Sequence, residues 1–389
     1  MLATFAATVL LHPTQSCCAS GEHWREHLPA EAIVAVTRVD QDAKEQKAQA
    51  QHRKDIEGDI ELGKKYSIEV DKELKLSENA AMSDRLQRVG AEMAKIANDA
   101  SVTVLWGDSR QNQFPYTFKL VKGDDVNAFS IPGGYIYFYE GLLNFTESDD
   151  ELAAVIGHEI SHASFRHLAT LRKEAGKFDW IQLPLLIIAA LSRSPDAINA
   201  LQAGTMAMQG IASGWNVQAE VAADYGGLQY MKLSRYNPVG ALTFMERLQY
   251  RDRFMPKINW GIYQTHPLSD ERAKFISQKL NEMGVPIKRS QTTTSLAAIA
   301  TPQDDGTVTV TFGKTKIFTF GGPDAGQRSL DAVARLNDFF DSVPDMFEVG
   351  MEGRRLTGRN RTLFSVQVDD AGAFDGDVDL AIQDAATAL

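Results

Sequence analysis

Apolar residues in the first third of the chain follow first a helical and then a strand pattern. From "IELGKKYSIEV" through "MSDRLQRVGAEMAKIA" they recur at helical spacing, which predicts two amphipathic helices joined near residues 77–80. Residues 41–60 are charged and lack an apolar stripe, so they predict an exposed lead-in helix. Strands are predicted for "SVTVLWG" at 101–107, for "YTFKLV" at 116–121, and for 127–143, where Pro and two glycines interrupt the pattern.

The middle of the chain predicts long helices. One carries "ELAAVIGHEISHASFRHLATL" at 151–171, and a second carries "VQAEVAADYGGLQYMKL" at 217–233. The "RYNP" sequence at 235–238 ends the second helix, and "ALTFMERLQYRD" begins another. Between the first two helices, the apolar segment at 180–191 contains Pro184 and is too short to span a bilayer, which favours a buried or interfacial helix over a peripheral membrane contact.

A change of composition separates the C-terminal part. Residues 289–306 are rich in Ser, Thr and Gln, which predicts a linker. Beyond it the pattern predicts strands at "TVTVTF" and "KIFTF", a helix at "SLDAVARLNDFFDSV", a strand at "TLFSVQV" and a final helix from about Val378. These elements predict a small α+β domain.

The N-terminus has a short apolar core that ends in small residues, as in an export signal, with cleavage conceivable after Ala19. It lacks the usual basic start. The alternative is a lipid-modified Cys17, although Thr14 stands where a lipoprotein signal prefers Leu. The pattern therefore predicts an exported, periplasmic or cell-envelope protein, with or without a lipid anchor.

Composition limits the chemistry that the chain can perform. The formal net charge is −11 and no basic stripe is present, which argues against a nucleic-acid partner and favours peptides or proteins. Both cysteines, Cys17 and Cys18, lie within the first twenty residues, so the rest of the chain has no thiol. Metal binding would then depend on His and carboxylate side chains.

The sequence "VIGHEISHASFRH" at 155–167 is the strongest chemical signal. Residues i and i+4 of a helix share a face, so His158 and His162 can direct their imidazoles at one point. Glu159 would then lie beside a metal ion, where it can accept a proton from a bound water. His167, five residues after His162, falls off this face and is predicted to be structural. The alternative is a pair of hydrogen-bonded core histidines.

A catalytic zinc site usually has three protein ligands and one open position. "AEVAAD" supplies a candidate third ligand in Glu220, and Asp224, one turn later on the same face, can orient an imidazole. A solvated helical face is the alternative for these two acids.

The order "GHEISHASFRH", "EVAAD" and "THPLSDER", preceded by "DVNAFSIPGGYIYFYEGLL", resembles the CAAX prenyl protease and HtpX-like zinc metallopeptidase family, of the gluzincin class. The resemblance covers about residues 56–285 and is greatest for the exported BepA-like and LoiP-like bacterial branch. It departs in two places: "WNVQAE" replaces the usual Ser-Arg before the glutamate helix, and the C-terminal part is not a tetratricopeptide domain.

The resemblance implies one zinc ion held by His158, His162 and Glu220, with Glu159 as general base and acid. It also implies that His266 approaches the metal, either as a resting-state ligand or as an oxyanion donor, and that Arg272 closes the same motif. A loop histidine that caps a helix is the alternative for His266. Substrate is expected to pair with an edge strand formed by Asn127, Ala128, Phe129, Ser130, Ile131, Pro132, Gly133 and Gly134. The alternative for "PGG" is a tight turn.

The overall expectation is an α+β protein with a mostly helical zincin-type peptidase domain. The predicted organisation is an export signal at 1–19, a helical lead-in at 20–55, the peptidase domain at 56–288, a linker at 289–306 and the small domain at 307–389. The expected activity is zinc-dependent hydrolysis of peptide bonds in unfolded or misassembled proteins. The alternative is a chaperone-like binding module in which His266 blocks the zinc.

Overall fold

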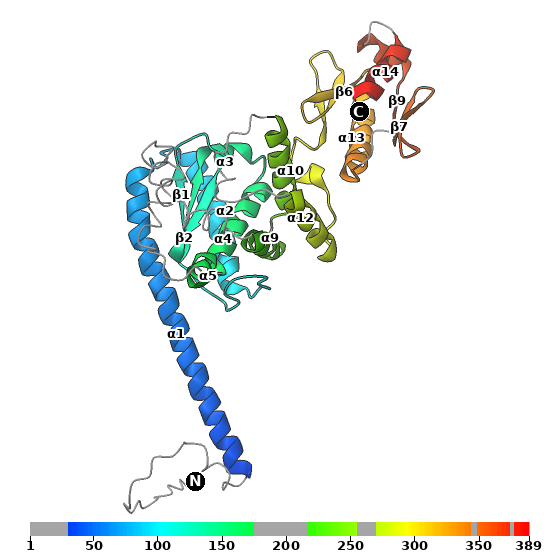
Figure 1. The fold of residues 1–389 in the computed structure, drawn as a ribbon. Helices are drawn as coiled ribbons and strands as arrows, with labels where there is room; N and C mark the ends of the chain where they lie inside the picture. The colour runs from blue at the N-terminus through cyan, green and yellow to red at the C-terminus, as the bar shows by residue number, and fades with distance from the viewer. Residues whose placement is uncertain (1–29, 175–216, 255–269, 344–347, 374–376, 389) are drawn as a thin grey trace, which may run out of the picture. The chain divides into compact units, whose positions relative to one another are not determined.

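The computed structural model describes residues 30–174, 217–254, 270–343, 348–373 and 377–388 (Figure 1). The predicted export signal, the apolar segment at 180–191 and His266 lie outside these residues. The chain divides into two compact units, Met1–Asp55 and Ile56–Leu389, and each is described by itself. Helix α1 (Ala30–Glu73) contains this boundary. Residues 41–49, within the first unit, are exposed.

The second unit is mainly helical and contains small sheets, in agreement with an α+β class. Its first helices are α2 (Ala80–Asp99), α3 (Glu140–Phe145), α4 (Asp149–Ser164), α5 (His167–Glu174), α9 (Val217–Lys232), α10 (Val239–Phe254) and α12 (Asp270–Glu282). Its first sheet has the order β1 (Thr117–Val121), β3 (Tyr135–Tyr139), β2 (Ala128–Ile131), with β1 parallel and β2 antiparallel to β3.

Helices cover both faces of this sheet. Tyr66 and Val70, near the end of α1, pack against residues of one face that include Phe129 and Tyr137. Alternate residues of the strands point to the other face, where the main core contains side chains of α2 and α4. The α4 helix is therefore held directly under the sheet whose edge strand is β2.

The interrupted strand predicted at 127–143 is wrong. β2 and β3 form an antiparallel hairpin joined by a short 3-10 turn, η2 (Pro132–Gly134). Gly133 and Gly134 have φ values of 78° and 83°, and these left-handed values favour glycine and reverse the chain. The prediction that this segment forms an edge is correct, because β2 is the last strand of the sheet.

The strand predicted at 101–107 is also wrong. This segment is irregular, and its backbone contacts near Thr103 and Asp108 are with α9 and with the residue that follows α4. The Thr103 backbone N–H donates to Gln229 Oε1, the Gln229 side chain donates to Thr103 O, and Asp108 N–H donates to Phe165 O. β-Branched residues favour strands only where a partner strand is available.

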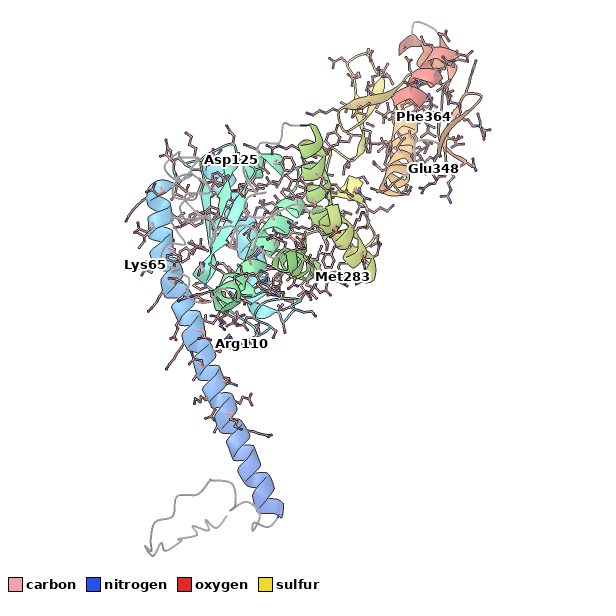
Figure 2. All side chains as sticks on the ribbon, viewed as in Figure 1. Lys65, Arg110, Asp125, Met283, Glu348 and Phe364 are labelled. Carbon is pink, nitrogen blue, oxygen red and sulfur yellow. The ribbon has the colours of Figure 1, made fainter. Side chains whose placement is uncertain are left out.

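The C-terminal part contains two three-stranded antiparallel sheets. Their order is β4 (Ala298–Pro302), β5 (Val308–Phe312), β6 (Thr315–Phe320), and β7 (Val349–Glu352), β8 (Arg355–Gly358), β9 (Arg361–Ser365). Helices α13 (Ala325–Asp341) and α14 (Val378–Ala388) share one core with them. Phe364 lies in this core beside Phe318 and Phe320, at ring-centroid distances of 5.1 and 5.5 Å (Figure 2).

The linker prediction for 289–306 needs a correction. Residues 298–302 form β4, which pairs with β5, so part of the Ser/Thr-rich stretch belongs to a sheet. Just before it lies a short 3-10 turn, η4 (Arg289–Gln291). Among the described residues, no helix is long and apolar enough to cross a membrane.

Candidate metal centre

Helix α4 begins with strong local signals. Ser148 caps its N-terminus by accepting a hydrogen bond from the Glu151 backbone N–H over 3.2 Å, and three acidic residues occupy its first turn. Both features stabilise the positive end of a helix dipole. The helix then buries nearly all of its residues from Leu152 to Ser164; His162 is buried and His158 is partly buried.

Helix α9 approaches α4 closely because glycine faces glycine. A Cβ on Gly157 would come within 3.2 Å of Gly227 Cα, and a Cβ on Gly227 would come within 3.1 Å of His158 N. Any larger residue would push the helices apart. The close packing brings Glu220 and Asp224, both buried on α9, to the imidazoles of α4.

Three side chains meet between the two helices. His158 Nε2 and His162 Nε2 are 3.1 Å apart, and Glu220 Oε2 and Oε1 lie 3.3 Å from these two nitrogens respectively. Ligands bound about 2.0–2.1 Å from a tetrahedral zinc ion are roughly 3.3 Å from one another, so the spacing suits such an ion. Two imidazoles and one carboxylate also form a donor set that zinc prefers, and they make up the one group of this kind found among the described residues.

The second ring nitrogen of His158, Nδ1, contacts the carboxylate of Asp224. This nitrogen is 2.9 Å from Asp224 Oδ1, which leaves Nε2 facing the other donors. Burial alone would lower the pKa of His158, but its contacts with Asp224 and Glu220 raise that pKa overall.

Arg272, on α12, lies behind both acids of α9. Its Nη1 is 3.0 Å from Glu220 Oε2, and Nη2 and Nε are 2.7 and 2.8 Å from the two oxygens of Asp224. Burial would raise the pKa of Asp224, but the guanidinium and His158 lower it overall, so the acid stays ionised. The resemblance implied only that Arg272 closes the motif of His266, and the structure places it in contact with Glu220 and Asp224.

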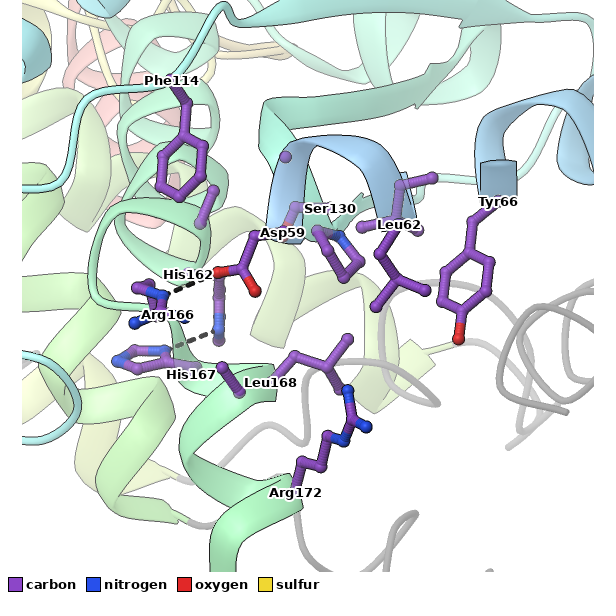
Figure 3. A pocket seen from close by; sticks show the side chains of 15 residues that line it. Asp59, Leu62, Tyr66, Phe114, Ser130, His162, Arg166, His167, Leu168 and Arg172 are labelled. Atoms are coloured by element: carbon purple, nitrogen blue, oxygen red, sulfur yellow. Dashed lines mark hydrogen bonds and ion pairs between the residues drawn. The ribbon is translucent and has the colours of Figure 1, made fainter. Parts of the chain in front are cut away.

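His162 has a different partner. Its Nδ1 is 2.9 Å from Nδ1 of His167 (Figure 3). Nε2 of His167 is 3.0 Å from the backbone oxygen of Trp106. His167 is fully buried, and burial together with His162 lowers its pKa well below the ordinary value. The prediction that His167 is structural therefore missed a direct contact with a candidate ligand.

A break in the helix makes this contact. The single helix predicted over 151–171 is two helices, because α4 ends at Ser164 and α5 starts at His167. Arg166 between them has a φ of 50°, a left-handed value that is costly for a residue with a Cβ. Its guanidinium is held by Asp59 and Asp108, at 2.6 and 3.1 Å, which offsets that cost.

Glu159 is fully buried on α4, and its charge is one of those that raise the pKa of Arg272, so it lies near the same cluster. The structure thus brings together His158, His162, Glu220, Asp224 and Arg272.

A cavity opens on the His162 side of this cluster (Figure 3). Its walls come from the end of α1, from the β2–β3 turn and from the start of α5, with Asp59, Ser130, Pro132, Arg166 and Arg172 among them. The predicted edge residues Ser130, Ile131, Pro132 and Gly133 therefore border the same space as His162.

Comparison with known proteins identifies the family of the chain. A model described as peptidase family M48 matches residues 82–280, just over half of the chain. The chain belongs to peptidase family M48. Its relatives within this family include the beta-barrel assembly-enhancing protease of Yersinia pestis, with 33% identity over 174 residues, which are 43% of this chain and 35% of that protein.

Two further M48 relatives are named as metallopeptidases. Mitochondrial metalloendopeptidase OMA1 of Arabidopsis thaliana is 33% identical over 153 residues, which cover 39% of this chain and 29% of that protein. Metalloprotease LoiP of Escherichia coli is 26% identical over 178 residues, which cover 45% of this chain and 66% of that protein. The chain thus spans about a third of the length of the beta-barrel assembly-enhancing proteases that it matches.

Proposed function

We propose that this M48 protein is a zinc-dependent endopeptidase that hydrolyses peptide bonds in unfolded or misassembled proteins. One zinc ion per chain would be held by His158, His162 and Glu220. The observation that carries the proposal is the convergence of these three side chains in a domain that belongs to a peptidase family. The Nε2 atoms of the two imidazoles are 3.1 Å apart, and each lies 3.3 Å from an oxygen of the Glu220 carboxylate.

Each residue of the cluster has a role in this proposal. A bound zinc ion would supply Lewis acidity for peptide hydrolysis, since it lowers the pKa of water and polarises a carbonyl group. Glu159 accepts the proton of the attacking water and returns it to the nitrogen of the leaving amine. Asp224 orients His158, and Arg272 keeps both acids of α9 ionised and in place. His266, outside the described residues, remains a proposed oxyanion donor or resting-state ligand.

The edge strand β2 supports an extended polypeptide as substrate. An extended chain can add itself to a sheet edge through backbone hydrogen bonds, with little demand on its sequence. β2 is the last strand of its sheet, and the turn that follows it borders the cavity beside His162. Flexible or unfolded segments can adopt this conformation, whereas folded proteins seldom offer one.

A role in the cell envelope is part of the same proposal. Relatives are named for assembly of beta-barrels, which supports misassembled envelope proteins as the substrate class. The apolar N-terminus, with its conceivable cleavage after Ala19, supports export to the periplasm. Lipid modification of Cys17, which would anchor the protein to a membrane, is the alternative. The acidic balance of the chain supports protein partners over nucleic acid.

Cleavage of an unfolded protein such as casein tests the proposal. The zinc-loaded wild type should cleave, and Glu159→Gln, which keeps the shape of the side chain but removes the base, should lose on the order of 10²–10⁴-fold in rate while still binding zinc. Lys274→Gln, on the exposed side of α12, is a matched control that should cleave normally. Retention of casein without cleavage by the wild type and by His266→Ala would overturn the proposal in favour of a binding module.

A further inference from the structure

We infer that His167 is a positioning residue that fixes the tautomer and ring orientation of His162, so that His162 Nε2 faces the metal. This inference rests on the proposed zinc centre and assigns to it a group outside the metal-binding triad. It follows from one chain of hydrogen bonds, which runs from the backbone of Trp106 through two imidazole rings to the donor atoms.

The carbonyl oxygen of Trp106 determines where the protons lie. A carbonyl can only accept, so His167 Nε2, 3.0 Å away, must carry the hydrogen. In a neutral imidazole the other nitrogen then has the lone pair, and His167 Nδ1 becomes an acceptor. The nitrogen 2.9 Å from it, His162 Nδ1, must therefore donate.

A proton on His162 Nδ1 leaves the lone pair on Nε2, the atom that lies 3.1 Å from His158 Nε2 and 3.3 Å from Glu220 Oε1. The opposite tautomer would place an N–H at the point where the donor atoms meet, and a ring in that state cannot bind a metal ion there. The Trp106 carbonyl thus sets the tautomer of His162 through His167.

The two imidazoles on α4 are therefore held in different ways. The negatively charged Asp224 accepts from His158, and Arg272 holds that acid in turn. A neutral imidazole performs the corresponding role for His162. A neutral partner orients the ring without adding a further negative charge to a centre that already contains Glu220 and Asp224.

Three neighbouring residues, Arg166, Trp106 and Gly107, position the His167 side chain. The left-handed residue Arg166 lies between α4 and α5 and turns the chain, so that a side chain five positions after His162 can reach back to it. The Trp106 ring lies 5.1 Å from the His167 ring. Gly107, with a φ of 110°, lets the loop approach closely, since a Cβ there would come within 2.5 Å of Phe165 O.

The tautomers of His162 and His167 can be measured directly in the wild-type protein. Nitrogen-15 NMR of the full-length, metal-free chain with labelled histidine distinguishes protonated from unprotonated ring nitrogens. We expect the proton on Nδ1 in His162 and on Nε2 in His167. Observation of His162 with its proton on Nε2 would overturn the inference, whatever the activity of the enzyme.

Zinc affinity, measured with a competing chelator, provides the second test. His167→Phe keeps a ring of similar size but cannot accept a hydrogen bond, so zinc should bind about 10- to 100-fold more weakly. His167→Asn should recover most of this loss, because its side-chain oxygen can occupy the position of Nδ1. Lys274→Gln, on the exposed side of α12, is the control, and its zinc affinity should stay within about threefold of the wild type.

The outcomes separate this inference from the proposed function. If the wild type binds no zinc, the proposed function fails, while the NMR result still decides the tautomer. If the wild type binds zinc and folded His167→Phe binds it equally well, the role of His167 is overturned and the zinc centre stands. An equal loss in His167→Asn and His167→Phe would show a packing role only, and would also overturn it.

Discussion

Arg272 and Asp224 form a two-point ion pair inside the protein, in which Nε and Nη2 of the guanidinium donate to Oδ2 and Oδ1 of the carboxylate over 2.8 and 2.7 Å. Nη1 of the same guanidinium lies 3.0 Å from Glu220. All three side chains are buried. One cation therefore holds both acids of α9, and with them the direction in which they face the two imidazoles.

Arg272→Lys should weaken zinc binding. Lysine keeps the positive charge but cannot hold two carboxylates with a planar fork, so Asp224 and Glu220 lose their fixed orientation. We expect zinc affinity to fall about 10- to 100-fold in a chelator competition assay. Lys274→Gln, on the exposed side of the same helix, should bind zinc as the wild type does. Equal zinc affinity in Arg272→Lys and the wild type would contradict this role.

Metal removal should destabilise the protein. The Nε2 atoms of two imidazoles are 3.1 Å apart, and each lies 3.3 Å from an oxygen of one carboxylate, so a bound cation would stabilise only the folded chain. Free zinc at 100 times its Kd should add about 2.7 kcal/mol to the free energy of unfolding, and a chelator should remove this gain.

Thermal unfolding with and without zinc measures this effect. Glu220→Gln should show a much smaller rise of Tm with zinc, since an amide is a poorer ligand than a carboxylate. An equal rise of Tm in the wild type and in Glu220→Gln would show that zinc binds elsewhere.

The sequence predicts those parts of the centre that depend on local geometry. His158 and His162 are four residues apart on one helix, and Glu220 and Asp224 are four apart on another, so each pair shares a face in any structure in which these helices form. The contact between the pairs depends on Gly157 and Gly227. Helical periodicity gives no information on which two helices will pack so closely.

The parts that sequence reasoning missed depend on distant residues. The break between α4 and α5 at Arg166 has no local signal, because its ion-pair partners Asp59 and Asp108 lie 107 and 58 positions earlier in the chain. His167 reaches His162 only through that break. The Ser/Thr-rich stretch that contains β4 was predicted as a linker for a similar reason, since its strand character comes from pairing with β5.

Acid should release one contact between the α3–α4 corner and the segment that precedes β4. The Glu147 carboxylate accepts hydrogen bonds from the hydroxyls of Thr293, Thr294 and Ser295 and from Ser295 N–H, and it is 2.9 Å from Arg247. Burial would raise the pKa of Glu147, but these donors lower it overall to about 2, from an ordinary value of 4.5.

A lowered folded-state pKa means that the ionised form stabilises the fold. This stabilisation is fully present above the unfolded-state pKa of 4.5 and is lost as the pH falls toward about 2. Glu147→Gln should therefore be less stable than the wild type in urea at pH 7, and the difference should shrink between pH 4.5 and pH 2. A difference that stays constant over this range would contradict the role of Glu147.

Two glycines of α1 should respond in opposite ways to alanine. At Gly63 a Cβ would come within 1.8 Å of Pro132 O, in the turn beside the cavity, whereas at Gly58 no atom lies within 4 Å. Gly63→Ala should lower the free energy of unfolding by about 1–3 kcal/mol through overpacking. Gly58→Ala should raise it by up to about 1 kcal/mol through helix propensity. Urea unfolding measures both, and equal effects would argue against close packing of α1 on the turn.

The location of the metal tests the central claim most directly. Diffraction data collected at the zinc absorption edge from crystals of the zinc-loaded protein would place the ion in an anomalous map. We predict one peak per chain, within about 2.0–2.2 Å of His158 Nε2, His162 Nε2 and a carboxylate oxygen of Glu220. A peak bound by other residues, or the absence of a peak between these two helices, would contradict the account.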